Sequence, residues 1–201
     1  MKEEQDYIQD IAEIRSMMER SSKFLSLSGW AGILAGIYAL IGAWIAYSLF
    51  EFHPDEILYT YTDLMNVILT AGGVLALALI SALLDSRRKA RKNEQKAWNA
   101  TSRRLLASMA VPLFAGGLLI VILISKGLIG LVAPLTLLFY GLALYNAGSF
   151  TIREVRLMGF VQMILGLLNV VFIGYGLLFW AIGFGAVHII YGIYMHFRFE
   201  R

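Results

Sequence analysis

The 201-residue sequence is 59% hydrophobic and only 15% charged, whereas soluble domains carry about 25% charged residues. This composition excludes an ordinary soluble domain, and the lack of cysteine excludes disulfides, thiolate metal sites and cysteine nucleophiles. The net charge of +3 does not indicate nucleic-acid binding. The basic residues flank hydrophobic runs, where they orient a membrane protein and attract anionic lipid headgroups.

Residues 1–24 predict an amphipathic helix on the cytoplasmic side. Its apolar residues recur at alternating spacings of three and four, which is one helical stripe. Acidic residues lead and basic residues follow, which suits the helix dipole. Three roles stay open: docking on the basic loop of the same chain, pairing with a protein partner or a second copy, or lying on the membrane. The stripe includes Tyr7, Ile11, Ile14, Met18 and Leu25.

Six hydrophobic stretches are long enough to cross a membrane, which takes about 20 apolar residues. They cover roughly residues 25–50, 64–84, 105–125, 128–147, 157–173 and 177–197. We therefore expect an all-α polytopic membrane protein, with six transmembrane helices and a cytoplasmic N-terminal amphipathic helix. The transmembrane domain should cover residues 25–197.

The basic residues predict how the spans are oriented. Sixteen of the seventeen Lys and Arg residues lie before the first span, after the last span, or in the second and fourth connections. Only Lys126 lies elsewhere. Because cytoplasmic loops collect Lys and Arg, we expect both termini in the cytoplasm. The predicted location is a bacterial inner membrane.

The second connection holds the densest group of basic residues. We expect this group, together with the N-terminal stripe, to contact anionic lipid headgroups or a protein partner. The basic residues in question are Arg87, Arg88, Lys89, Arg91 and Lys92.

Small residues at a spacing of four predict close helix packing. Gly32 and Gly36 lie in the first span, and Gly185 follows Ala181 in the last span. Such spacing lets two helix backbones approach each other in a membrane. The pattern fits either a homodimer face or packing inside the six-helix bundle, so the oligomeric state stays open.

Uncharged polar residues form the best candidate for a buried site. Gln162 and Asn169 are seven residues apart on one face of the fifth span, and His188 and Tyr191 are three apart on the sixth. The cluster fits interhelical hydrogen bonding, or a ligand or proton site. No charged residue falls in the middle of a span, and Asp85 is expected at the end of the second span, in contact with water.

No motif predicts an enzyme or a cofactor. The zinc-protease, serine-hydrolase and phosphate-loop motifs are absent. Haem is a poor fit, because His188 and His196 share one helix and cannot hold an iron from opposite sides. We expect no catalytic, cofactor-binding or metal-binding residues.

Two segments carry a family resemblance. EIRSMMERSSKFLSLSG near the start and FWAIGFGAVHIIYGIYMHF at the end resemble uncharacterised bacterial six-span membrane proteins. The Gly-punctuated hairpins look more distantly like the HdeD-type acid-resistance membrane proteins. The first resemblance implies the fold without an activity, the second suggests a role in stress, and no functional residue is carried over from either.

Two functions follow as hypotheses. The first is a non-enzymatic membrane module, stress-related or regulatory and scaffolding, that acts through its cytoplasmic face. The alternative is a small channel or carrier for a neutral or weakly polar solute, which would use Gln162, Asn169, His188 and Tyr191.

Overall fold

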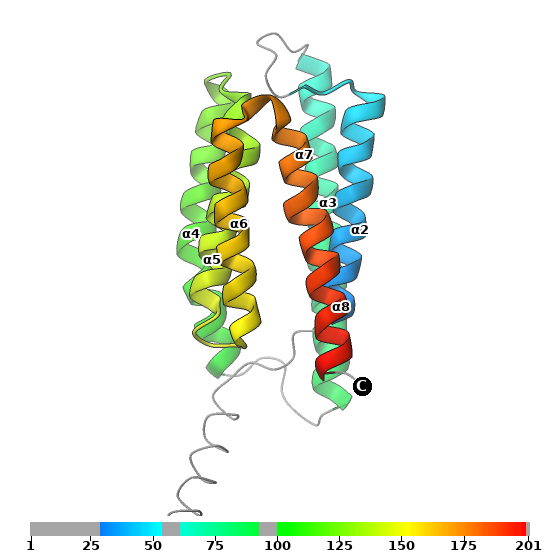
Figure 1. Cartoon of the computed structure of the whole chain (residues 1–201), viewed down its shortest axis with the longest axis vertical. Coiled ribbons are helices and arrows are strands. Elements are labelled where there is room, and N and C mark those ends of the chain that lie inside the picture. The colour runs from blue at the N-terminus through cyan, green and yellow to red at the C-terminus, as the bar shows by residue number, and fades with distance from the viewer. Residues whose placement is uncertain (1–28, 54–60, 93–99, 200–201) are drawn as a thin grey trace, which may run out of the picture.

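The computed structural model describes residues 29–53, 61–92 and 100–199 (Figure 1). The predicted amphipathic segment, with Ile11, Ile14 and Met18, lies outside the described residues. Within the described ranges the chain is helical and contains no strand. This confirms the all-α class.

Six helical segments are long and apolar enough to cross a membrane, as predicted. They run side by side, with consecutive segments antiparallel (Figure 1). The last segment is a single continuous rod made of three parts, α7, η3 and α8. In chain order the elements are α2 (Gly29–Leu49), α3 (Tyr61–Lys92), α4 (Ala100–Ser125), η1 (Ile129–Leu131), α5 (Val132–Ala147), α6 (Arg153–Val171), η2 (Ile173–Tyr175), α7 (Gly176–Trp180), η3 (Ala181–Val187) and α8 (His188–Phe199).

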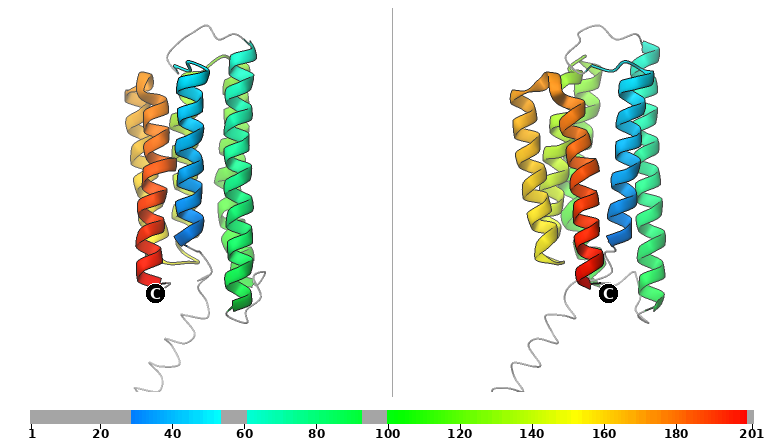
Figure 2. Two further views of the ribbon diagram at one scale, coloured as in Figure 1. Left: turned by 90° about the vertical axis from the view of Figure 1, so that its right-hand side faces the viewer. Right: turned by 45° about the vertical axis from the view of Figure 1, so that its right-hand side comes forward.

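The main departure from the predicted boundaries is α3. The hydrophobic run predicted a helix over residues 64–84, but α3 continues to Lys92 because Lys, Arg and Ala favour helix once a helix has begun. Figure 2 shows α3 reaching farther than its neighbours at the end of the bundle where it stops. We call this end, where α3 ends and α4 begins, the basic end, and the other the opposite end.

The connection between α4 and α5, at the opposite end, is tight. After α4 the chain turns at Lys126 and Gly127, and Gly127 has a φ of 73°, which glycine adopts without strain. The Leu128 N–H then donates to the Leu123 carbonyl at 2.9 Å, which closes the helix end. The short turn holds α4 and α5 antiparallel.

Close backbone contacts join two helix pairs. A Cβ added to Gly141 would lie 2.7 Å from the Gly159 carbonyl, and one added to Gly159 would lie 2.6 Å from the Gly141 carbonyl. The α5 and α6 backbones therefore touch directly. α2 meets the last helix in the same way, since a Cβ on Gly29 would lie 2.4 Å from the Gly192 carbonyl.

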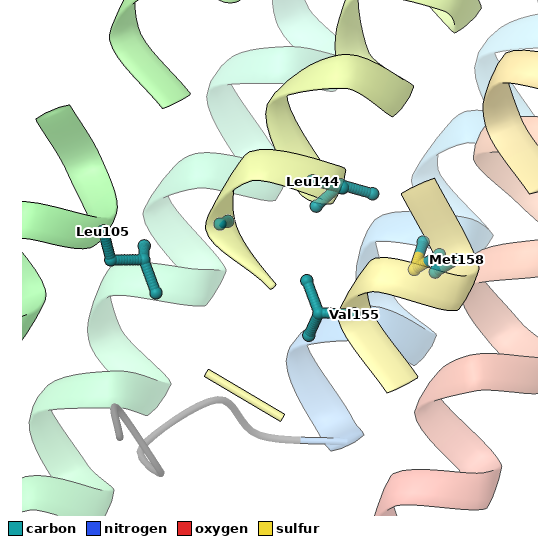
Figure 3. Packing of buried hydrophobic residues seen from close by; sticks show 5 residues of the cluster. Leu105, Leu144, Val155 and Met158 are labelled. Atoms are coloured by element: carbon teal, nitrogen blue, oxygen red, sulfur yellow. The ribbon is translucent and has the colours of Figure 1, made fainter. Parts of the chain in front are cut away.

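A compact apolar core lies near the basic end. It joins α4, α5 and α6, and Figure 3 shows the side chain of Val155 pointing into the space between Leu105, Leu144 and Met158. Met109, Tyr140 and Tyr191 pack around this core, which therefore also reaches the last helix.

α3 and α4 lie at the edge of the bundle. α3 packs mainly against α2, and α4 packs mainly against α5. None of the membrane-length window of α3 is buried inside the protein, compared with 33% of the windows of α5 and α6. An apolar helix with so little protein around it is suited to hydrocarbon rather than water.

Asp85 lies on α3 at the end of the predicted second span, and the residue is partly exposed. Its Oδ2 atom is shielded and has no hydrogen-bond partner within the part of the chain that the structure describes.

Candidate buried polar site

The last membrane-length helix changes its winding halfway along. Between α7 and α8, residues Ala181–Val187 form a π-helix, which contains Gly183 and Gly185. Short π-helical stretches inside α-helices occur frequently at functional sites, because they displace the regular backbone ladder. The candidate site is built around this stretch.

The carbonyl of Gly183 is the centre of the site. It accepts a hydrogen bond from Gln162 Nε2 of α6 at 2.7 Å and another from His188 Nδ1 at 2.9 Å. Gln162 is completely buried and His188 is nearly so. Two side chains from different helices therefore bind one backbone oxygen inside the bundle.

These bonds define the proton positions on the imidazole. A carbonyl only accepts, so His188 Nδ1 carries a hydrogen. In the neutral ring Nε2 is then an acceptor, and it lies 2.9 Å from the hydroxyl of Tyr140 on α5, which donates to it. The hydrogen-bond chain ends at the Gly183 carbonyl, which has no proton to pass on.

Aromatic rings surround this hydrogen-bond chain. The ring centroid of His188 lies 5.5 Å from that of Tyr140 and 5.8 Å from that of Phe184, in stacked arrangements. The ring centroid of Trp180 lies 5.0 Å from that of Phe184. The rings fix the orientation of the imidazole and exclude lipid from it.

Three polar atoms along α6 and the last helix have no partner among the described residues. They are Gln162 Oε1, Asn169 Oδ1 and the Tyr191 hydroxyl, all shielded from solvent. The amide nitrogen of Asn169 makes only a long bond of 3.4 Å, to the Gly176 carbonyl. Leaving a buried polar group unpaired costs about 1–3 kcal/mol. Each atom is therefore open to a further hydrogen bond.

The structure separates the four residues that the sequence grouped together. Gln162 and His188 meet at Gly183, whereas Asn169 lies beside Gly176, near the opposite end. The ring of Tyr191 packs on the apolar core near the basic end. The four form a column along α6 and the last helix rather than one compact cluster.

Sequence reasoning missed Tyr140 and the Gly183 carbonyl. Tyr140 is 48 residues from His188 in the chain, and nothing in its local sequence marks it as a hydrogen-bond donor to that ring. A signal existed for the π-helix, since the closely spaced Gly183 and Gly185 weaken regular α-helix. The predicted packing pattern included only Gly185 of this pair, and Gly183 was not singled out.

The packing glycines of the first span face the last helix of the same chain. A Cβ on Gly36 would lie 2.6 Å from the Gly185 carbonyl, and one on Gly32 would lie 3.2 Å from Gly192 Cα. A Cβ on Gly185 would meet Leu40 of α2 at 2.4 Å. These three positions are therefore covered within one chain.

The basic group extends the surface of the basic end. Arg87, Arg88 and Arg91 are exposed on α3, and Lys89 is partly buried. Lys92 ends the helix, and its side chain lies outside the described residues. These side chains lie on α3, whereas the buried column lies on α6 and the last helix, so the two candidate sites are built from different elements.

The fold and the site define a multi-pass α-helical membrane protein. In the described ranges, no three His, Asp or Glu side chains gather into a set that could hold a metal ion. No family model, curated protein or solved structure matches the chain.

Proposed function

We propose that this protein is a non-enzymatic regulatory or scaffolding module of a bacterial inner membrane, and that it acts through a cytoplasmic basic end. The observation that supports the proposal is the placement of exposed arginines at that end. They are Arg87, Arg88, Arg91, Arg103 and Arg104. The stress-related part of the proposal rests only on the distant HdeD-like patterning.

The length of α3 gives this surface its reach. Its 32 residues extend about 48 Å, compared with about 30 Å of hydrocarbon. The last turns of α3 then stand beyond the hydrocarbon, with Arg87, Arg88 and Arg91 exposed. Each such charge contributes about 1 kcal/mol to binding an anionic lipid surface. The same surface suits an acidic protein segment, including the acid-rich start of this chain.

The orientation can be tested directly because the chain has no cysteine. Single cysteines would replace Ser149, which is exposed at the basic end, or Ser125, which is exposed at the opposite end. A membrane-impermeant maleimide added outside spheroplasts should label Ser125→Cys and not Ser149→Cys. The reverse pattern would invert the proposed topology.

The module itself is tested by removing its charges. In the triple variant Arg87→Gln, Arg88→Gln, Arg91→Gln, the amount of co-purifying partner or of bound anionic lipid should fall at least about tenfold. A tenfold fall in binding corresponds to only about 1.4 kcal/mol, less than the three charges together should contribute. Lys126→Gln, at the opposite end, is the matched control. An unchanged set of bound proteins and lipids in the triple variant would refute the proposal.

A second candidate function is a carrier or channel for a neutral or weakly polar solute. It is favoured by the shielded acceptors Gln162 Oε1 and Asn169 Oδ1, which lie at two levels of the bundle. Gln162→Ala and His188→Leu should each reduce solute flux in proteoliposomes. This candidate would be removed if the parent protein shows no flux, or if both variants show the same flux as the parent protein.

A further inference from the structure

The side chain of Arg156 is held in place at the basic end. Arg156 belongs to the first turn of α6, beside the connection that joins α5 to α6 (Figure 1). One of its terminal NH₂ groups donates to Ser149 Oγ at 3.0 Å, and the central carbon of its guanidinium lies 5.4 Å from the ring centroid of Tyr145. An aromatic ring under the flat guanidinium and a hydroxyl at its edge together fix its orientation.

The backbone around these three side chains is closely packed. A Cβ added to Gly148 would lie 2.6 Å from Arg156 Cβ and 3.0 Å from Arg156 Cα, so the end of α5 touches the start of α6. The Phe150 N–H donates to the Ala147 carbonyl at 2.9 Å, which holds the connection against α5. The three side chains are therefore positioned by backbone contacts.

Most of the hydrogen-bonding capacity of Arg156 is unused. A guanidinium carries several N–H donors. Within the part of the chain that the structure describes, Arg156 donates only to Ser149 and has no ion-pair partner. The acid of the same turn, Glu154, lies 3.5 Å from Arg198 instead. The Ser149 hydroxyl accepts from Arg156, so its own hydrogen is available to donate. This group of donors with one positive charge matches a phosphate.

Neither helix stability nor topology explains this arrangement. Arg153 and Arg156 lie in the first turn of α6, where the helix dipole favours negative charge over positive charge. Orienting the spans requires a cation somewhere in the connection. It does not require a guanidinium that is fixed by a ring and a hydroxyl. A bound anion would offset the unfavourable position of the two arginines.

An apolar stripe continues from Arg156 along the same face of α6. Phe160, Ile164 and Leu167 follow at four, eight and eleven residues, which is the spacing of one helical face. Their side chains are 51%, 41% and 57% exposed on the bundle. The 19 residues of α6 extend about 28 Å, close to the thickness of the hydrocarbon. Arg156 therefore lies at the membrane surface and the stripe lies within the hydrocarbon.

We propose that this face of the α5–α6 pair binds one anionic phospholipid, with its phosphate on Arg156 and Ser149 and an acyl chain along the apolar stripe. A phospholipid matches both parts of the surface. A soluble phosphate would leave the stripe unused, and an acidic protein segment would have to enter the hydrocarbon to cover it. The inference goes beyond the proposed function, because it uses none of the arginines of α3 and α4.

The test counts the ligands bound to the purified full chain in detergent by native mass spectrometry. The probes are dioleoyl phosphatidylglycerol, dioleoylglycerol, which has the chains without the phosphate, and glycerol phosphate, which has the phosphate without the chains. Phosphatidylglycerol should bind at least about tenfold more tightly than either of the others, a difference of about 1.4 kcal/mol. Equally tight binding of dioleoylglycerol or of glycerol phosphate, or no binding of phosphatidylglycerol, would overturn the proposal.

Substitutions separate this site from a general effect of positive charge. Arg156→Gln should weaken the binding of the first phosphatidylglycerol about tenfold. Arg156→Lys keeps the charge but loses the planar fork, so it should still bind about fivefold more weakly than the parent protein. Tyr145→Leu, which removes the ring under the guanidinium, should weaken binding about threefold. Full rescue by lysine would overturn the proposal, because any cation at this position would then suffice.

The matched control is Lys126→Gln, which removes one positive charge at the opposite end and should leave phosphatidylglycerol binding unchanged. A loss in the control as large as that in Arg156→Gln would overturn the proposal. If Arg156→Gln fails to fold, the three probes on the parent protein and the Tyr145→Leu variant still decide.

This site and the proposed function fail in different ways. If the triple variant on α3 keeps all its bound proteins and lipids while Arg156→Gln loses the first phosphatidylglycerol, the proposed function is removed and the site remains. If the triple variant loses a partner while Arg156→Gln binds the lipid as the parent protein does, the site is removed and the proposed function remains.

Discussion

The α5–α6 pair and α3 differ in how closely they pack against the rest of the protein. α5 and α6 touch backbone to backbone at Gly141 and Gly159. In each of these two segments, 33% of the membrane-length window is buried inside the protein. α3 has no buried part in its window, and a Cβ added to Gly72 or Gly73 would meet nothing within 4 Å.

Hydrophobicity and burial run in opposite directions in the two regions. The α3 window has the highest mean hydropathy of the six, and the α6 window has the lowest. In water this order would be reversed, because burial would follow hydrophobicity. Lipid tails are as apolar as leucine, so helices associate through close contact and hydrogen bonds instead. α6 provides both, with Gly159 at a backbone contact and Gln162 at a hydrogen bond.

The largest effect is expected where backbone meets backbone. Gly159→Ala would place a Cβ 2.6 Å from the Gly141 carbonyl and from the Tyr145 amide nitrogen, neither of which can turn aside. We expect the free energy of unfolding to fall by about 3 kcal/mol, the upper range for overpacking. Reversible unfolding in mild detergent measures it. A change below about 0.5 kcal/mol, the usual size at surface sites, would show that α5 and α6 can move apart.

A smaller loss is expected inside the π-helix. In Gly183→Ala the new Cβ would lie 2.6 Å from Gln162 Oε1 and 2.4 Å from Leu137 Cδ2. Both are side-chain atoms that can shift in part, so we expect about 2 kcal/mol of destabilisation. Gly185→Ala is the comparison, because the three atoms nearest its Cβ would all belong to Leu40, a partly exposed side chain on α2. An equal loss in both variants would argue against a special role for Gly183.

The hydrogen bond from Tyr140 to the His188 imidazole should contribute less to the free energy of unfolding than the glycine packing does. Tyr140→Phe removes the donor to His188 Nε2 and leaves that nitrogen unpaired. Hydrogen bonds between membrane helices contribute about 0.6–2 kcal/mol, and we expect a loss near 1 kcal/mol in the same unfolding measurement. Tyr175→Phe, at an exposed position, should change stability by less than about 0.5 kcal/mol. Equal effects would place the hydroxyl of Tyr140 outside the stabilising network.

The smallest effect is expected on α3. Gly73→Ala fills open space and favours helix, and alanine exceeds glycine by up to about 1 kcal/mol in a helix interior. We expect a gain of about 0.5 kcal/mol and no change in the oligomeric state seen by light scattering. A clear loss of stability or of an oligomer would show that something other than lipid covers this face.

The number of helices followed from the sequence because the signal is local. A chain in hydrocarbon must satisfy its backbone hydrogen bonds within each segment, so a long apolar run becomes a helix whatever its neighbours do. Gln162 and Asn169 were also identifiable, since neutral amides stand out in such runs. The end of α3 was predicted less well, because the helix outlasts the apolar run and carries Arg87 to Lys92 with it.

The contacts that these residues make with other helices could not be predicted from the sequence in the same way. Whether Gly36 faces Gly185 or another chain depends on how two helices about 150 residues apart are rotated and aligned, and no local pattern contains that rotation. The bond from Tyr140 to His188, the meeting of Gln162 and His188 at Gly183, and the orphaned oxygens depend on the same alignment. The sequence by itself determined six membrane-length helices, their polar residues and the uneven distribution of positive charge. The tertiary structure decided which faces of those helices meet, because in a bilayer that choice depends on a few close contacts rather than on the hydrophobic pattern.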